Sequence, residues 1–160
     1  MLSVRRSRAA AAVALGLAGA MAVLPGCWAS SSHRAAGGIL SIDVPAADGA
    51  AGPVTVEGRM SVGERLEVRL GASSGTGYAW RLAGPIPAIM RMTTGDPAGT
   101  VQPLDPAKAM PGGPSWTVFG MDAVSQGDAN MRFVLVRPWE QGVSPVRQVD
   151  LRVRVDPAPR

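Results

Sequence analysis

Few residues of this chain could carry covalent chemistry. Among its 160 residues there is one Cys and one His, Cys27 and His33. Residues 71–75 satisfy the G-x-S-x-G pattern of a hydrolase nucleophile elbow, which requires a strand-to-helix turn and a histidine later in the chain. No histidine follows His33, no helical pattern follows Gly75, and Lys108 lies in a proline-rich stretch without the spacing of a Ser-Lys pair. We therefore predict that the protein is not an enzyme.

The Cys and His counts also exclude an internal disulfide and the metal sites that are built from these two residue types. A single Cys cannot form an internal disulfide, and one Cys with one His cannot supply a CxxC zinc site or a multi-histidine centre. His33 lies in a stretch, 29–38, that has no apolar periodicity, whereas a catalytic base must be held within hydrogen-bond reach of its partner. We expect no metal and no cofactor.

The N-terminal segment has the features of an export signal. Three arginines precede an uninterrupted run of small and apolar residues at 9–24, which has the length of a signal-peptide core and is short for a membrane span of about 20 residues. The run ends in the sequence Leu24-Pro25-Gly26-Cys27, which resembles the processing box of bacterial lipoproteins. The resemblance implies removal of residues 1–26 and lipidation of Cys27. The alternatives are a plain secretory signal and a buried thiol.

Acyl chains on Cys27 would anchor the protein to a membrane. Trp28, rather than Asp, follows the Cys, which by resemblance to lipoprotein sorting favours the outer membrane. We therefore expect the protein in the cell envelope, at the periplasmic face of the outer membrane or at the cell surface. Loss of residues 1–26 removes three arginines and lowers the formal net charge from +4 to +1. No basic stripe remains for phosphates, so nucleic acid is not an expected partner.

The rest of the chain divides into a tether and one domain. Residues 27–38 contain Cys27 and a polar stretch that we expect to be a flexible tether. Within 39–160, apolar residues recur at every second position, and Pro and Gly interrupt the chain too often for a long helix. The clearest alternations lie at 66–70, 119–123, 131–135 and 149–155. About seven or eight short strands predict an all-β fold, an antiparallel β-sandwich of immunoglobulin size.

Three turn-rich segments, each next to a predicted strand, carry a family resemblance. Residues 73–80 are similar to the Asn-Pro-Thr-Thr-Gly-Tyr-x-Trp loop of the chagasin-type inhibitors of papain-like cysteine peptidases, with Ser-Ser-Gly in place of Asn-Pro-Thr. A Gly-Gly pair at 112–113 precedes a strand whose Phe119-x-Met121-x-Ala123-x-x-x-Gly127 pattern resembles that of the family. Residues 137–140 match its Arg-Pro-Trp-Glu loop fully. The resemblance extends over about 39–156.

The resemblance implies an immunoglobulin-like sandwich whose three loops cluster at one end and plug a peptidase cleft without being cleaved. Thr76 and Gly77 would lie nearest the nucleophile of the target, Trp139 against an aromatic wall on its primed side, and the Gly-Gly pair on the opposite flank. The implied partner is a papain-like cysteine peptidase. The residues expected to form the inhibitory loops are Gly75, Thr76, Gly77, Tyr78, Gly112, Gly113, Arg137, Pro138 and Trp139.

Packing offers a second interpretation for several of these residues. Trp80 and Tyr78 are expected to fill the core at the start of a strand, whereas Trp139, between Pro and Glu in a loop, is expected to be a contact. The Gly-Gly pair could be a mere turn, and Trp116 could be a loop contact or a cross-strand packing residue. Rigid loops would favour inhibition, because a loop that is already ordered loses less conformational entropy when it enters a peptidase cleft.

The altered first loop contains an extra Gly and lacks the Pro, so we predict weaker or differently selective inhibition than for the full motif. An immunoglobulin-like envelope lipoprotein that binds another protein through the same loops is the alternative function.

Overall fold

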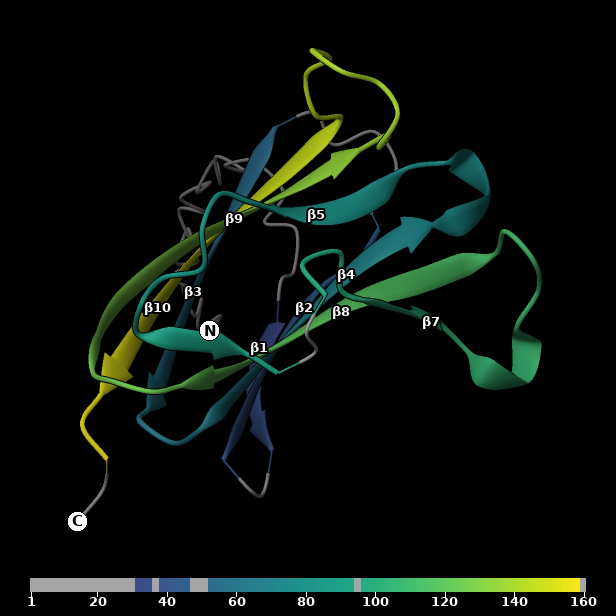
Figure 1. Cartoon of the computed structure of the whole chain (residues 1–160). Coiled ribbons are helices and arrows are strands. Elements are labelled where there is room, and N and C mark those ends of the chain that lie inside the picture. Colours follow the sequence, from purple (N-terminus) through teal and green to yellow (C-terminus); the bar gives the residue numbers. More distant parts are fainter. Residues whose placement is uncertain (1–30, 36–37, 47–51, 94–95, 159–160) are drawn as a thin grey trace, which may run out of the picture.

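The computed structural model describes residues 31–35, 38–46, 52–93 and 96–158, which form a sandwich of two β-sheets (Figure 1). The first sheet has the strand order β1 (Ser31–Ala35), β2 (Ile39–Val44), β4 (Arg65–Ser73), β8 (Pro114–Ala123) and β6 (Met90–Met92), and β7 (Thr100–Pro103) pairs with β8 as well. The second sheet has the order β3 (Pro53–Ser61), β10 (Arg147–Asp156), β9 (Gly127–Val136) and β5 (Ala79–Ala83). Two short 3₁₀ helices, η1 (Ser74–Thr76) and η2 (Pro106–Lys108), lie between strands. The predicted all-β sandwich is confirmed.

Two details of the predicted sheet are corrected by the structure. The described residues form ten strands rather than seven or eight, because β1, β6 and β7 are short edge elements. The pairs β2–β4 and β3–β10 are parallel, whereas the remaining pairs are antiparallel. The parallel pair β2–β4 arises because β3, which lies between these strands in the sequence, belongs to the other sheet. When the chain returns to the first sheet as β4, this strand therefore runs in the same direction as β2.

The segment expected to be a flexible tether also differs in part. Ser31–Ala35 forms β1, which pairs in antiparallel register with β2 from Ser31 opposite Asp43 to Ala35 opposite Ile39. Without β1, the outer backbone groups of β2 would be an unpaired edge, and a polar segment can satisfy them because a strand ladder uses only main-chain donors and acceptors. The remaining residues of the predicted tether apart from Gly38, and the signal segment with Cys27, lie outside the described residues.

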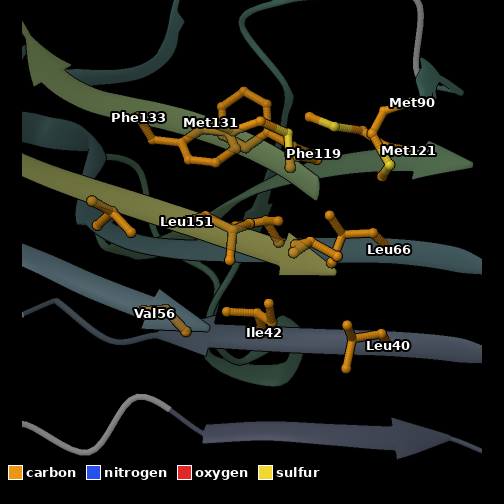
Figure 2. Packing of buried hydrophobic residues seen from close by; sticks show 14 of the residues in the cluster. Leu40, Ile42, Val56, Leu66, Met90, Phe119, Met121, Met131, Phe133 and Leu151 are labelled. Atoms are coloured by element: carbon orange, nitrogen blue, oxygen red, sulfur yellow. The ribbon is translucent and has the colours of Figure 1, made fainter. Parts of the chain in front are cut away.

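The core lies between the two sheets and follows the alternation seen in the sequence. In β10, Val149, Leu151, Val153 and Val155 are buried, while Arg152 and Arg154 between them are exposed. Figure 2 shows buried side chains from both sheets, among them Phe119 of β8 and Phe133 of β9, whose ring centroids are 4.8 Å apart. Close packing of such rings contributes beyond the area that they bury.

One corner of the sandwich is packed unusually closely. Trp80 at the start of β5 is fully buried, and its indole Nε1 donates a hydrogen bond to the carbonyl oxygen of Gly71, 3.1 Å away. A Cβ atom on Gly71 would lie 2.3 Å from the backbone nitrogen of Ala46, so only glycine allows this approach. The guanidinium of Arg147 lies 5.9 Å from the Trp80 ring and donates to the Pro45 carbonyl, and burial lowers its pKa. Trp80 is therefore core, as predicted.

Among the residues that the structure describes, no helix is long and apolar enough to cross a membrane.

Candidate functional site

The strand topology brings three loops to one end of the sandwich. Loop 1 (74–78) follows β4, loop 2 (104–113) precedes β8, and loop 3 (137–146) follows β9. Loop 2 connects strands of the first sheet, loop 3 connects strands of the second, and loop 1 crosses from the first sheet to the second. Loop 1 consequently lies between the other two (Figure 1). The register agrees, because Ser73 lies opposite Pro114 and Ala79 opposite Val136.

Loop 1 contacts loop 2 backbone to backbone. The amide nitrogen of Gly75 donates to the carbonyl oxygen of Gly112 over 3.1 Å. A Cβ on Gly75 would lie 2.9 Å from that same oxygen, and Gly112 itself adopts a φ of +76°. Both positions therefore require glycine, one for close approach and the other for a left-handed backbone. The Gly-Gly pair does more than form a turn, because its first residue holds loop 1.

Loop 1 is also stabilised by a side-chain hydrogen bond and a 3₁₀ turn of its own. Its first three residues form η1, and the hydroxyl of Thr76 donates to the carbonyl oxygen of Ser73 over 2.6 Å. Gly77 ends η1 with a φ of +75°. The hydroxyl bond, the backbone bond to loop 2 and the turn of η1 limit the freedom of a segment that lacks the proline of the full motif. Together they reduce the entropy that the loop would lose on binding.

Loop 3 packs against the other side of loop 1. A Cβ on Gly77 would lie 2.6 Å from Cη2 of Trp139 and 3.1 Å from its Cζ2, so the edge of the indole ring rests on this glycine. Trp139 nevertheless remains 67% exposed. It is thus held in place on one side and open to solvent on the other, so it is not a core residue.

An arginine joins loop 3 to loop 1. The Arg137 guanidinium lies 4.6 Å from the centroid of the Tyr78 ring, and its Nη1 donates to Oε1 of Glu140 over 3.0 Å. The hydrogen bond with Glu140, followed by the electrostatic influence of Tyr78, raises the pKa of Arg137. Tyr78 is half-buried under this guanidinium, so it is neither a fully buried core residue nor a fully exposed contact residue. Pro138 is exposed beside them.

Trp116 belongs to the packing of the sheet. It lies on β8 and is half-buried on the outer face of the first sheet, where the Arg69 guanidinium is 5.1 Å from its ring centroid. His33 is on β1, at the outer edge of the same sheet. Among the described residues, no group of three or more His, Cys, Asp or Glu side chains could hold a metal ion.

Apart from Trp139, the exposed apolar residues of the loop end were not singled out from the sequence. Seven large hydrophobic residues are strongly exposed in the described part of the chain, and all except Val124 lie on β7, loop 2 or loop 3. The six are Val101, Leu104, Met110, Trp139, Val143 and Val146. For the five that lie in loops 2 and 3, the signal in the sequence is an apolar residue inside a stretch rich in Pro and Gly, where no sheet face is available to bury it. Six of the seven strongly exposed large hydrophobic residues in the described part of the chain therefore gather at the loop end.

Comparisons with known proteins identify a family model and two similar folds. A family model described as the chagasin family peptidase inhibitor I42 matches residues 59–153. The crystal structure of the cysteine protease inhibitor EhICP2 from Entamoeba histolytica matches with a TM-score of 0.52 and 21% identity, over 65% of this chain and 94% of that one. PbICP-C, in a structure of its complex with falcipain-2, matches with a TM-score of 0.51 and 22% identity, over 72% of this chain and 98% of that one. No curated protein matches the sequence significantly.

Proposed function

The chain belongs to the chagasin family of peptidase inhibitors, and we propose that it inhibits papain-like cysteine peptidases by inserting loops 1–3 together into the active-site cleft. As a member of an inhibitor family it is not an enzyme. The observation that carries the proposal is the convergence of the three loops, with loop 1 bonded to loop 2 through Gly75 and Gly112 and braced by Trp139 of loop 3. The two structural matches, an inhibitor of cysteine proteases and a partner of falcipain-2, support the class of target.

Loop 1 has the properties needed at the centre of such a wedge. Its residues carry no charge, and the small side chains of Gly75, Thr76 and Gly77 leave its backbone accessible to a narrow cleft. Thr76 and Gly77 would lie nearest the catalytic cysteine of the target. The turn of η1 and the φ of +75° at Gly77 hold this segment away from the extended shape of a peptide substrate. We therefore expect the loop to occupy the cleft without being cleaved.

Loops 2 and 3 would flank the cleft. Trp139 offers a large, exposed ring whose position is already set by Gly77, so little side-chain entropy remains to be lost on binding. The Gly112–Gly113 pair allows the backbone of loop 2 to approach the opposite wall. Arg137, Tyr78 and Glu140 link loop 3 to loop 1, so the two loops would enter the cleft as one unit.

We further propose that the protein acts as a lipoprotein of the cell envelope, anchored through Cys27. The lipoprotein-like box at 24–27 supports this. β1 begins at Ser31, four residues after Cys27, and four extended residues span at most about 14 Å. Ser31 pairs with Asp43, whose other neighbour is Arg69, the central residue of β4. An anchored molecule with β1 paired would consequently keep the sandwich close to the membrane surface.

The decisive experiment is a titration of papain with purified residues 28–160, which include every residue that the structure describes. We expect stoichiometric, reversible inhibition and an intact inhibitor band on gels after prolonged incubation. A variant with Trp139 replaced by Ala should inhibit more weakly, and Val124→Ala, at the opposite end of β8, serves as the control. If the protein at micromolar concentration inhibits neither papain nor a cathepsin, the proposal is contradicted and a different protein partner for the same loops is favoured.

Lipidation is tested separately. In a bacterial host with a lipoprotein pathway, the full chain should incorporate labelled palmitate and partition with membranes. Cys27→Ala should abolish both. Incorporation that persists in this variant would refute the anchor site without affecting the inhibition proposal.

A further inference from the structure

Two exposed side chains stand on opposite flanks of loop 1. Trp139 on loop 3 and Met110 on loop 2 are each 67% exposed, the highest values among the large hydrophobic residues that the structure describes. Met110 is also unlike the other described methionines, of which Met60, Met90, Met121 and Met131 are buried in the core. Met110 leaves most of its apolar surface in water in the free protein, and together with Val101 and Leu104 it lines one hollow, so these residues form an exposed apolar patch that a contact outside the protein could cover.

Met110 is held in place by the backbone of loop 2. Its carbonyl oxygen accepts a hydrogen bond from the Gly113 amide over 3.1 Å, and a Cβ on Gly113 would lie 2.8 Å from Cγ of Met110. Gly113 is adjacent to Gly112, the residue bonded to Gly75 of loop 1. Met110 is therefore connected to the centre of the loop end through a short run of fixed backbone.

Leu104 lies at the other end of loop 2 and is also anchored. Its amide donates to the carbonyl oxygen of Pro114 over 3.1 Å, and its side chain remains 51% exposed. Between Leu104 and Met110 the chain turns through η2, which is capped by Asp105, whose carboxylate accepts from the Ala107 amide. The turn leaves an open hollow of about 510 Å³, lined mainly by Pro and apolar residues that include Val101, Leu104 and Met110.

The charges at the hollow cancel. Asp105 and Lys108 both line it, and they form an ion pair with 3.6 Å between Oδ2 and Nζ. The hollow thus has no net charge with which to attract an ion, and its exposed apolar lining would gain from excluding water. Its volume exceeds that of a single large side chain.

We propose that Met110, Leu104 and the hollow between them form a second apolar anchor of the inhibitor, which receives an aliphatic or aromatic side chain from the rim of the target's cleft. This rests on the proposed function and deepens it, because it assigns a determinant of target selection. The anchor is continuous with the loop end through Gly113 and lies on the flank opposite Trp139. A target whose rim carries an apolar residue on that flank is bound tightly, and one with a charged residue there is bound weakly.

The chemistry of methionine adds a property to this anchor. Its unbranched, polarisable side chain adapts to differently shaped partners. A β-branched or aromatic residue at 110 would select one rim shape, whereas Met110 accepts several. The anchor therefore discriminates apolar from charged rims rather than one apolar residue from another.

The test compares the double variant L104S/M110S with V124S in residues 28–160. All three substituted residues are exposed, so both proteins are expected to keep their thermal midpoints, and Val124 lies at the opposite end of the sandwich. Dissociation rates and inhibition constants are measured against papain and against papain variants that carry Leu or Asp at the rim position facing loop 2. We expect L104S/M110S to weaken binding to the Leu-bearing enzyme by at least tenfold, mainly through faster dissociation, and to leave binding to the Asp-bearing enzyme almost unchanged.

Three results would overturn the proposal. Equal inhibition constants for L104S/M110S and the unsubstituted protein, while Trp139→Ala weakens inhibition, would refute the second anchor and leave the proposed function intact. Equal losses against both enzymes would refute its role in selection. A change from dimer to monomer on substitution, observed by analytical ultracentrifugation, would show that the hollow binds a second copy of the chain. If the unsubstituted protein inhibits neither enzyme, the proposed function itself fails.

Discussion

Replacing Gly77 with Ala tests how strongly loop 1 controls the position of Trp139. Gly77 has a φ of +75°, where an L-residue costs about 1–2 kcal/mol relative to glycine. The new Cβ would lie 2.6 Å from Cη2 of Trp139. The ring must then move by about 1 Å to reach an ordinary contact distance between carbon atoms. Because the indole is 67% exposed, it can move outward without disturbing the core.

The two effects have separate readouts. The free energy of unfolding, measured by urea denaturation, should fall by about 1–2 kcal/mol from the backbone strain alone. The inhibition constant should rise by roughly 10- to 30-fold, since a displaced anchor residue loses up to about 2 kcal/mol of binding free energy. Gly63 provides the control, because it has a φ of +88°, nothing lies within 4 Å of a Cβ placed on it, and it follows β3 at the opposite end of the sandwich.

Gly63→Ala should therefore reproduce the loss of stability without the loss of inhibition. A double-mutant cycle sharpens the comparison: in a protein that already carries Trp139→Ala, the substitution at Gly77 should have little further effect on the inhibition constant. If Gly77→Ala and Gly63→Ala inhibit equally well, or if the loss is undiminished in the Trp139→Ala protein, the contact between Gly77 and Trp139 does not position the anchor.

Three further outcomes follow from the packing and charges described above. Trp139→Ala should raise the inhibition constant by about 30-fold with little change in thermal midpoint, whereas Trp80→Ala should destabilise the fold by about 3–5 kcal/mol, because Trp80 is fully buried. Hydrogen bonds from Arg132 and Gln148 lower the pKa of Asp150 from 3.8, so this carboxylate stabilises the fold above pH 3.8 and the contribution is lost as the pH falls through the lowered value. Asp150→Asn should accordingly cost up to about 1 kcal/mol in urea at pH 7, with the two proteins converging as the pH falls below the lowered pKa of Asp150 and with equal inhibition at neutral pH. Hydrogen peroxide should convert the exposed Met110 thioether to the sulfoxide, with release of water, faster than the buried methionines. After peroxide has been removed with catalase, inhibition of the Leu-bearing papain should be weaker for the treated protein but unchanged for Met110→Leu, and mass spectrometry locates the added oxygen.

Much of the fold was predictable because it depends on local patterns. Alternation at 149–155 predicted a strand with one buried face, and β10 has that face buried in full. The alternations at 66–70, 119–123 and 131–135 likewise lie within β4, β8 and β9. The short strands β1, β6 and β7 escaped prediction because they have three to five residues and are formed by pairing to an existing edge rather than by their own periodicity. The two parallel strand pairs were not predicted for a related reason, because the direction of a strand depends on which sheet each intervening strand joins.

The candidate site, like the fold, was predictable from the sequence only in part. The motifs at 76–80, 112–113 and 137–140 identified the family, and the family model confirms it. The roles of their residues in inhibition remain predictions. Contacts such as Gly75 with Gly112, or Arg137 with Tyr78, join residues far apart in the chain and leave no pattern in it. Met110 and Leu104 likewise gained significance only when the structure showed them exposed on one flank of loop 1.

Side-chain alternation and loop motifs are properties of short segments, so the sequence alone predicts that the described domain is a β-sandwich of the chagasin family with three marked loops. How those loops cooperate follows from the tertiary structure. Loop 1 crosses between the sheets and therefore lies between loop 2 and loop 3, where glycines at 75, 77 and 112 let the three backbones and the Trp139 ring approach within contact distance. That proximity depends on how two sheets stack, which no segment of the chain specifies alone.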